Sequence, residues 1–433
     1  MKKVKISEFL KSDFRDFSLY DCQINIPSLV DGLKVSQRKV MWTVLNNPKT
    51  VTVEQLSSLA SAYTKYHHGA VSLAEVIIKL AQNFTGSNNV NWLIPDGQFG
   101  NILSHDASSP RYISTSVNSN WRNWYKKEDD IVMQYEMEDG EVTEPTYFIP
   151  LVPTILFNGS SGIGTGYACS IFSYNPKDVV ECVKKAISNK EQPELIPYYE
   201  GYKGKIEKVN GQTIFHGVYE KVNATAIRIT QLPIGYDITS YKEVLIKLIE
   251  SGEIKDFDDH STEDKWDIVV YANREWIKQH ESIIIEKLKL VTKDTENFVV
   301  WDENKKIRRF DNPNQLVLHF VKWRLGIFEE RRVKQIELYE KDLTWLNEKK
   351  NFIEYFINNS KRLVNLNKQE LFDDLSAQGF VEINKLMNIK IYNLTREEID
   401  ELTNQIYKTE ADIDALEKTN SKEMYLNSIK NVK

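Results

Sequence analysis

The sequence predicts a multidomain α+β protein, because three consecutive stretches of the chain carry different residue patterns. Its 433 residues leave room for about two to four domains. Hydrophobic residues form 41% of the chain and charged residues 27%, a balance that allows a sizeable core and argues against global disorder. We expect domains at residues 1–150, 151–312 and 313–433.

The first stretch, 1–150, is mostly helical by pattern and locally basic. Segments 35–45 and 71–84 repeat apolar residues at helical spacing. Between Gly32 and Tyr125 there are eight Lys and Arg against four Asp and Glu, a net charge of +4 on a chain whose formal net charge is −6. The charge distribution therefore allows a nucleic-acid partner that the total charge disfavours.

The middle stretch, 151–312, mixes strand and helix patterns. The segments ATAIRITQLP (224–233) and WDIVVYA (266–272) are rich in β-branched residues and are typical of strands. The segment KEVLIKLIESG (242–252) has the pattern of a helix that ends at a glycine. We expect an α/β domain here.

The last stretch, 313–433, is expected to be helical, because all twelve prolines lie at or before Pro313. Residues that are apolar, except for Lys350 and Thr409, recur in alternating steps of three and four along 336–357 and 399–416. Each segment thus has one apolar stripe that requires a partner helix. Thr395 and Glu398 form a capping box at the start of the second helix. We predict an antiparallel helical pair with a small helical end, roughly 358–394.

Composition also excludes several classes of protein. The three cysteines are scattered and form no CxxC motif, which argues against a disulfide scaffold or a zinc site and favours a reducing compartment. The N-terminus is basic but lacks the apolar region of a signal peptide. The longest apolar stretch, 147–157, contains two prolines and is too short to cross a bilayer. We expect a cytoplasmic protein with no membrane partner.

The segment SHDASSPRYISTS (104–116) places Arg111 and Tyr112 among small residues. One interpretation is an ordinary surface loop. The other is a nucleophilic phenol beside a cation that binds phosphate. The residues alone leave both open.

Cations begin the predicted helix in DGLKVSQRKVMW (31–42). Lys34 and Arg38 lie four residues apart and can share one helix face, with Lys39 beside them. Such a face suits a phosphate backbone, although a solvated helix face has the same composition.

The segment KYHHGAVS (65–72) joins Lys65, His67 and His68 to a predicted helix start. Two adjacent histidines do not share one metal from a helix, where spacing i, i+4 is needed. They can donate hydrogen bonds to an anion at the helix N-terminus or serve only as a structural cap.

The segment FNGSSGIGTGYA (157–168) holds four glycines but lacks the lysine of a nucleotide P-loop and the setting of a dinucleotide site. Ile163 stands on this bare backbone. An apolar side chain held out in this way can enter a base step as a wedge; a tight turn is the alternative. The acidic segment 256–267 is expected to be a solvated loop and not a metal site.

Taken together, these segments resemble the DNA breakage–reunion part of type IIA topoisomerases. The run from Ser61 to Asn101 is similar to the eukaryotic-type enzyme nearly residue for residue, and further matches follow the family's order. They include IPSLVDGLKVSQRK (26–39), SSPRY (108–112), NGSSGIGTGYACSI (158–171) and IKDFDDHSTEDKWDIVV (254–270).

The resemblance implies a fold and an activity. Residues 1–150 would form a winged-helix-type DNA cleavage domain, 151–312 a tower domain, and 313–433 a coiled coil with a helical dimerisation gate. The implied activity is that of an isomerase, an ATP-dependent topoisomerase. It makes a transient double-strand break through 5′-phosphotyrosyl links and passes a second duplex through it, giving relaxation or decatenation.

The resemblance also assigns residues. Tyr112 would be the nucleophile, Arg111 would hold the phosphate, and His68 would hydrogen-bond it. The DNA-binding residues would be Lys34, Arg38, Lys39, Lys65, His67 and the intercalating Ile163. One position departs from the family, because Ile24 stands where an arginine is usual; Gln23 is a possible substitute.

Partners follow from the same resemblance. The chain is similar to the medium subunit of the split topoisomerases of large tailed phages, which would place it in the host cytoplasm. We expect a second copy of the chain, double-stranded DNA, and an ATPase/Toprim large subunit. That subunit would hold the Mg²⁺ ligands and use the ATP, with no metal site on this chain. The alternatives are a non-catalytic DNA-bending architectural protein and a tyrosine recombinase, which leaves 3′-phosphotyrosyl links.

Overall fold

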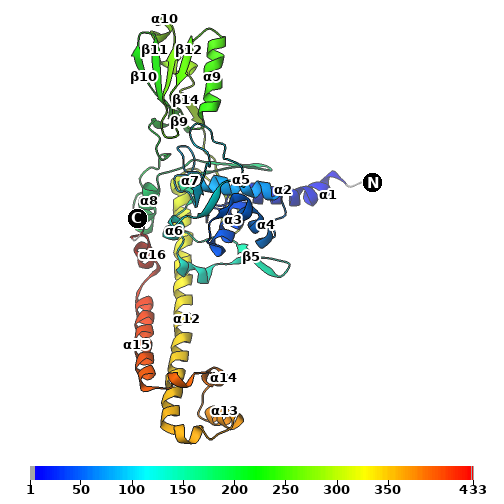
Figure 1. The fold of residues 1–433 in the computed structure, drawn as a ribbon, viewed down its shortest axis with the longest axis vertical. Helices are drawn as coiled ribbons and strands as arrows, with labels where there is room; N and C mark the ends of the chain where they lie inside the picture. Colours follow the sequence, from blue (N-terminus) through cyan, green and yellow to red (C-terminus); the bar gives the residue numbers. More distant parts are fainter. Residues whose placement is uncertain (1–4, 431, 433) are drawn as a thin grey trace. The chain divides into compact units, whose positions relative to one another are not determined.

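A helical layer and a small antiparallel sheet form the first part of the fold in the computed structural model, which describes residues 5–430 and 432. The helices are α1 (Ile6–Lys11), α2 (Asp13–Asn25), α3 (Val35–Asn46), α4 (Val53–Tyr63) and α5 (Ala70–Ala81). Helices α3, α4 and α5 pack against one another (Figure 1). The predicted helix at 71–84 ends at residue 81.

The sheet beside these helices has the strand order β1 (Val51–Thr52), β3 (Ser114–Val117), β2 (Leu93–Asp96). Helix α4 begins directly after β1 because Thr52 caps it, accepting from the backbone N–H of Gln55 at 3.2 Å. The short helices α6 (Asn120–Trp124) and η1 (Lys127–Val132) lead to a hairpin of β4 (Tyr135–Glu138) and β5 (Glu141–Pro145).

A second hairpin follows α7 (Ile155–Asn158). Its strands are β6 (Ser160–Gly164) and β7 (Tyr167–Ile171), and α8 (Pro176–Ile187) comes next. The hairpin of β15 (Phe298–Trp301) and β16 (Ile307–Phe310) returns beside β7, where Ser170 and Asn297 form a β-bridge.

The middle stretch builds two antiparallel sheets. The strands predicted within 224–233 and 266–272 both lie in the first of them, and residues 256–259, expected to belong to a loop, form a further strand of the same sheet. One has the order β10 (Val218–Asn223), β11 (Ala226–Gln231), β13 (Ile268–Tyr271), β12 (Asp256–Asp259). The other has the order β14 (Val291–Asp294), β9 (Gln212–His216), β8 (Ile206–Val209). Helix α9 (Ile238–Glu250) covers the four-stranded sheet (Figure 1), with α10 (Arg274–Ile277) and α11 (Glu281–Lys287) nearby in sequence. We call the hydrophobic cluster enclosed by α9 and this sheet the α9 core; it includes Tyr241, Trp266 and Trp276.

The chain divides into two compact units, residues 1–324 with 428–433, and residues 325–427. The 51-residue helix α12 (Pro313–Leu363) begins in the first and continues into the second. The other C-terminal elements are α13 (Lys368–Ala377), α14 (Ile383–Leu386), η2 (Ile391–Asn393), α15 (Arg396–Lys418) and α16 (Ser421–Lys430).

Within the second unit, α12 and α15 are antiparallel, as predicted. Lys349 pairs with Glu398 at 2.6 Å, while Arg332 donates to the carbonyl of Leu416, so residue numbers rise in opposite directions along the two helices. Thr395 caps α15 by accepting from the N–H of Glu398. The small helices α13 and α14 enclose their own core with the end of α12.

Candidate nucleic-acid interface

Tyr112 lies on the connection between β2 and β3 with its side chain open to solvent, 77% exposed. The backbone beside it is fixed, because the N-terminal N–H groups of α4 donate to the carbonyls of Ile113 and Pro110 at 3.0 and 3.2 Å. The guanidinium carbon of Arg111 lies 6.0 Å from the centroid of the Tyr112 ring. The structure therefore presents an accessible phenol with an adjacent cation on a rigid backbone.

His68 is held by a residue that the sequence did not single out. Its Nε2 lies 2.7 Å from the hydroxyl of Tyr20 on α2, and the edge of the Tyr66 ring packs on the imidazole at 5.3 Å between centroids. Among the contacts described for residues 5–430, none joins His68 directly to Tyr112. The contact with Tyr20 spans 48 positions and leaves no local sequence signal.

Lys65 and His67 face acidic residues of the β4–β5 hairpin, which we call the acidic hairpin (135–145). The Lys65 ammonium lies 3.0 Å from both the backbone oxygen of Glu138 and the carboxylate of Glu141. The hydrogen bond to Glu141 raises the pKa of Lys65. His67 Nε2 contacts the carboxylate of Glu138. Carboxylates thus occupy the positions where phosphates are expected.

Lys34, which precedes α3, and Arg38 and Lys39 within it do not form one exposed face, which corrects the sequence expectation. Arg38 is only 7% exposed and makes two bonds to the buried carboxylate of Asp31, at 2.6 and 3.0 Å. Its side chain is buried together with the apolar residues of α3. Lys39 donates to Glu144 at 2.8 Å.

Lys34 supports the β6–β7 hairpin instead. Its ammonium donates to the backbone oxygen of Ser161 at 2.6 Å, and burial lowers the pKa of Lys34. Ile163 follows on the same hairpin and is 82% exposed. A side chain on Gly162 would collide with the carbonyl oxygen of Asn25, so only glycine lets the hairpin lie this close to α2. The exposed Ile163 thus lies on a hairpin that is held in place by its contacts with Lys34 and α2.

Residues 5–430 and 432, as described, contain no group of three or more His, Cys, Asp or Glu able to hold a metal ion. The side chains around Tyr112 thus offer no carboxylate set that fits Mg²⁺, which prefers several oxygen ligands.

Within the same residues, no helix is both long and apolar enough for a membrane span. The three cysteines are buried, and burial raises the pKa of Cys169 to about 12. Gln23, the possible substitute for the missing arginine, lines a cavity with Arg38 and Glu136.

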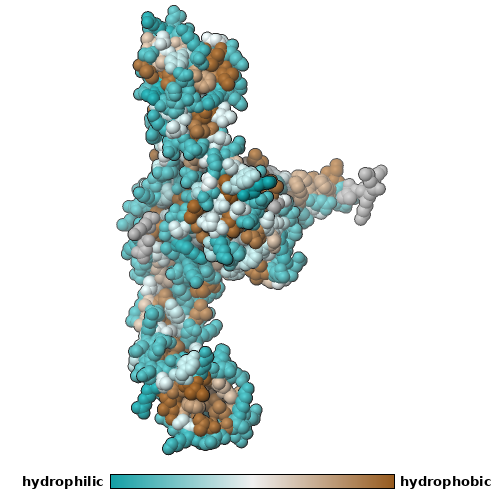
Figure 2. Space-filling view, viewed as in Figure 1, coloured by the Kyte–Doolittle hydropathy of each residue, from teal (hydrophilic) through white to brown (hydrophobic). Residues whose placement is uncertain are grey.

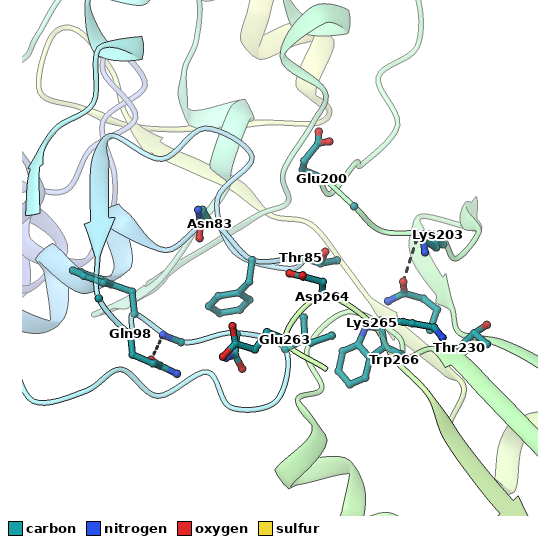
Figure 3. Close-up of a pocket in the computed structure, with 18 residues that line it drawn as sticks. Asn83, Thr85, Gln98, Glu200, Lys203, Thr230, Glu263, Asp264, Lys265 and Trp266 are labelled. Atoms are coloured by element: carbon teal, nitrogen blue, oxygen red, sulfur yellow. Dashed lines mark hydrogen bonds between the residues drawn. The ribbon is translucent and has the colours of Figure 1, made fainter. Parts of the chain in front are cut away.

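A cavity of about 610 Å³ lies between residues 83–85, the 97–102 segment, residues 200–203 and residues 263–266 (Figure 3). None of the residues predicted for the site lines it. Glu200, Glu263 and Asp264 contribute carboxylates to its wall, and Lys203 and Lys265 contribute ammonium groups. The candidate interface is therefore the exposed surface around Tyr112 and not this cavity.

Three comparisons define the class of this fold. Residues 25–432 match the family model that describes DNA gyrase/topoisomerase IV A subunits. The chain is 34% identical to DNA topoisomerase 2 of Arabidopsis thaliana over 394 residues, covering 87% of this chain and 27% of the relative. It is 33% identical to DNA topoisomerase 2 of Invertebrate iridescent virus 6 over 447 residues, covering 99% and 38%.

The fold matches a solved structure with a TM-score of 0.91 and 30% identity. That structure is the topoisomerase II DNA-binding, cleavage and re-ligation domain of Plasmodium falciparum, and the match covers 98% of this chain and 63% of that chain. The architecture is thus that of a type II topoisomerase cleavage domain. The chain belongs to the family of DNA gyrase and topoisomerase IV A subunits. It spans well under half the length of the two relatives named above.

Proposed function

We propose that this chain is the DNA breakage–reunion subunit of an ATP-dependent type IIA topoisomerase, acting in relaxation or decatenation. The observation that carries the proposal is the exposed Tyr112 phenol beside Arg111, on a fold that matches a DNA cleavage and re-ligation domain. The family relation supports the activity, and the accessible phenol supplies the nucleophile that it needs.

In the proposed reaction the Tyr112 oxygen attacks a DNA phosphorus. A bond from phosphorus to this oxygen forms while the bond to the 3′ oxygen breaks, and the proton lost by the phenol is balanced by one gained at the 3′ hydroxyl. The product is a 5′-phosphotyrosyl diester. Because one phosphodiester replaces another, the reverse attack reseals the strand without ATP. Arg111 stabilises the added negative charge on the phosphate oxygens.

His68 is proposed to hydrogen-bond the same phosphate. Tyr20 holds the imidazole at 2.7 Å, so the ring is oriented before the phosphate arrives. Lys34, Lys65 and His67 are proposed to contact the flanking backbone. Lys39 is assigned to the fold, because its side chain is 11% exposed and its ammonium donates to Glu144 and to the carbonyl of Thr64. Arg38 is assigned a structural role instead, because its guanidinium is buried against Asp31.

The acidic hairpin should weaken DNA binding, because its carboxylates compete with phosphates for Lys65 and His67. Replacing both Glu138 and Glu141 with Gln is expected to tighten binding of a short duplex about two- to fivefold, because exposed ion pairs contribute little free energy. Fluorescence anisotropy at fixed salt measures the change. The charge-matched control is the double variant Glu191→Gln/Glu194→Gln, at two exposed loop positions outside the hairpin. Equal gains in both variants would show only a change in net charge.

Ile163 should act as a wedge in the bent DNA. Ile163→Ala is expected to reduce the DNA bend measured by energy transfer between end labels. Cleavage should fall at least about tenfold, since unstacking a base step costs a few kcal/mol. Ile196→Ala, another exposed isoleucine at 52%, serves as the control. An unchanged bend angle for Ile163→Ala would remove the wedge assignment.

Two copies of the chain are proposed to act together, because one tyrosine cuts one strand and duplex passage requires both. The second unit offers a surface for this dimer. Figure 2 shows apolar side chains at its end that carries α13 and α14, and Val364, Val381 and Ile391 are 68–85% exposed. A separate ATPase/Toprim subunit is proposed to hold Mg²⁺ and use ATP, so the action of that metal lies outside this chain.

The test is ATP-dependent decatenation by the complex purified with this chain, together with cleavage of end-labelled duplex. Protein linked to the 5′ end of each break supports the proposal. Protein linked to the 3′ end identifies recombinase-type chemistry instead. DNA bending without any covalent complex identifies the architectural alternative.

A further inference from the structure

The loop before Tyr112 is anchored in a different part of the fold. Residues 97–109, here called the 97–109 loop, connect β2 to the Arg111–Tyr112 pair. The Ile102 side chain on this loop is 4% exposed and belongs to the α9 core, together with Ile238 and Trp266. Leu103 packs against the same cluster. A residue ten positions before the phenol is thus part of a core built by residues 227–290.

The N-terminus of α9 also binds the loop through its polar groups. The N–H of Ile238 donates to the carbonyl of Ile102 at 3.1 Å, and the Thr239 hydroxyl donates to the carbonyl of Leu103 at 3.2 Å. The N–H of His105 donates to the carboxylate of Asp237 at 3.4 Å. Asp237 also caps α9 through the N–H of Ser240. Three hydrogen bonds therefore join the loop to the N-terminus of α9.

The other side of the loop is fixed toward Tyr112. The Gln82 amide donates to the carbonyls of Phe99 and His105 at 2.9 and 3.1 Å. The N–H of Ser108 donates to the carbonyl of Gln98 at 3.0 Å, which closes the loop three residues before Arg111.

Two further features stiffen the closed loop. A side chain on Gly100 would meet the carbonyl oxygen of His105 at 2.6 Å, and its φ of +95° also requires glycine. The His105 ring stacks on Phe84 with centroids 4.9 Å apart. Figure 3 shows the Gln98 end of the loop facing the cavity. The loop is thus bonded to α9 at Ile102 and Leu103 and closed at Ser108, three residues before Arg111.

We propose that the attachment of the 97–109 loop to the α9 core positions the nucleophile, with Ile102 and Thr239 as positioning residues that set the rate of strand cleavage and do not contact DNA. This inference rests on the proposed function of Tyr112. Nucleophilic attack is sensitive to placement, since a misplacement of about 1 Å can cost about 10²-fold in rate. Loosening the anchor should lower the cleavage rate and leave DNA affinity unchanged.

The test compares Ile102→Ala with Ile284→Ala in the assembled topoisomerase. Both truncate an isoleucine buried in the α9 core, but only Ile102 lies on the loop. We expect Ile102→Ala to slow single-turnover cleavage at saturating DNA at least about tenfold. Its Kd for DNA should match wild type, and Ile284→Ala should cleave at nearly the wild-type rate. Equal slowing of both, or none in Ile102→Ala, overturns the proposal.

If Ile102→Ala does not fold, Thr239→Val provides the test in its place. This substitution removes only the hydroxyl that donates a hydrogen bond to the loop. Slowed cleavage that Thr239→Ser restores supports the proposal, and a wild-type rate for Thr239→Val overturns it. The proposed function fails separately, if wild type forms no covalent complex or if that complex persists without the Tyr112 hydroxyl. If Ile102→Ala and Thr239→Val cleave at the wild-type rate and cleavage still depends on Tyr112, the positioning role of the loop is rejected and the proposed function stands.

Discussion

Tyr112→Phe is expected to eliminate the covalent DNA complex while leaving DNA affinity unchanged. The substitution removes one oxygen and keeps the ring, which is 77% exposed and packs on no core. The lost atom is the one that would bond phosphorus, so no covalent link can form at this position. Trapping with denaturant after incubation with labelled DNA measures the complex, and anisotropy measures affinity.

The matched control is Tyr63→Phe, which removes the same atom from another exposed tyrosine of the same domain, 49% exposed on α4. This variant should trap DNA as wild type does. A covalent complex that survives in Tyr112→Phe and disappears in Tyr63→Phe would move the nucleophile to α4. Survival in both would reject a tyrosine in either position.

Helix and strand patterns predicted the fold well where local forces decide it. The C-terminal pair could be predicted because the absence of proline and the alternating apolar steps act within a few residues. The predicted helix at 242–252 begins earlier, at Ile238, because Asp237 provides a cap that precedes the apolar pattern. The strands at β11 and β13 lie within the segments predicted for them.

The candidate site was less accessible from sequence because its contacts cross long stretches of chain. The pairing of Lys65 and His67 with the acidic hairpin spans about seventy positions. A sequence shows that these cations exist but not that carboxylates already face them. The Tyr20 contact to His68 and the anchoring of Ile102 were missed for the same reason. Arg38 shows most clearly what the sequence does not reveal. Its charge predicted an exposed side chain, but the ion pair with Asp31 holds it in the interior.

Arg38→Ala is expected to lower the free energy of unfolding by about 3–5 kcal/mol, because it leaves the buried Asp31 carboxylate without its cation. Asp31 is 1% exposed, and apart from Arg38 its carboxylate accepts only from the N–H groups of Leu33 and Phe148, at 3.1 Å each, among the hydrogen bonds described. Urea denaturation measures the loss. The double variant Asp31→Asn/Arg38→Met removes both charges and should recover part of the stability.

The salt dependence of DNA binding separates this structural role from the original expectation of a phosphate contact. A cation that contacts phosphate releases about one counterion, so its removal lowers the slope of log affinity against log salt by about one. Lys65→Ala, at a cation on the surface, should show this reduction with little loss of stability. Arg38→Ala, measured where it remains folded, should keep the wild-type slope. A reduced slope with unchanged stability would instead place the Arg38 guanidinium on the DNA, and would require the Asp31 pair to open when DNA binds.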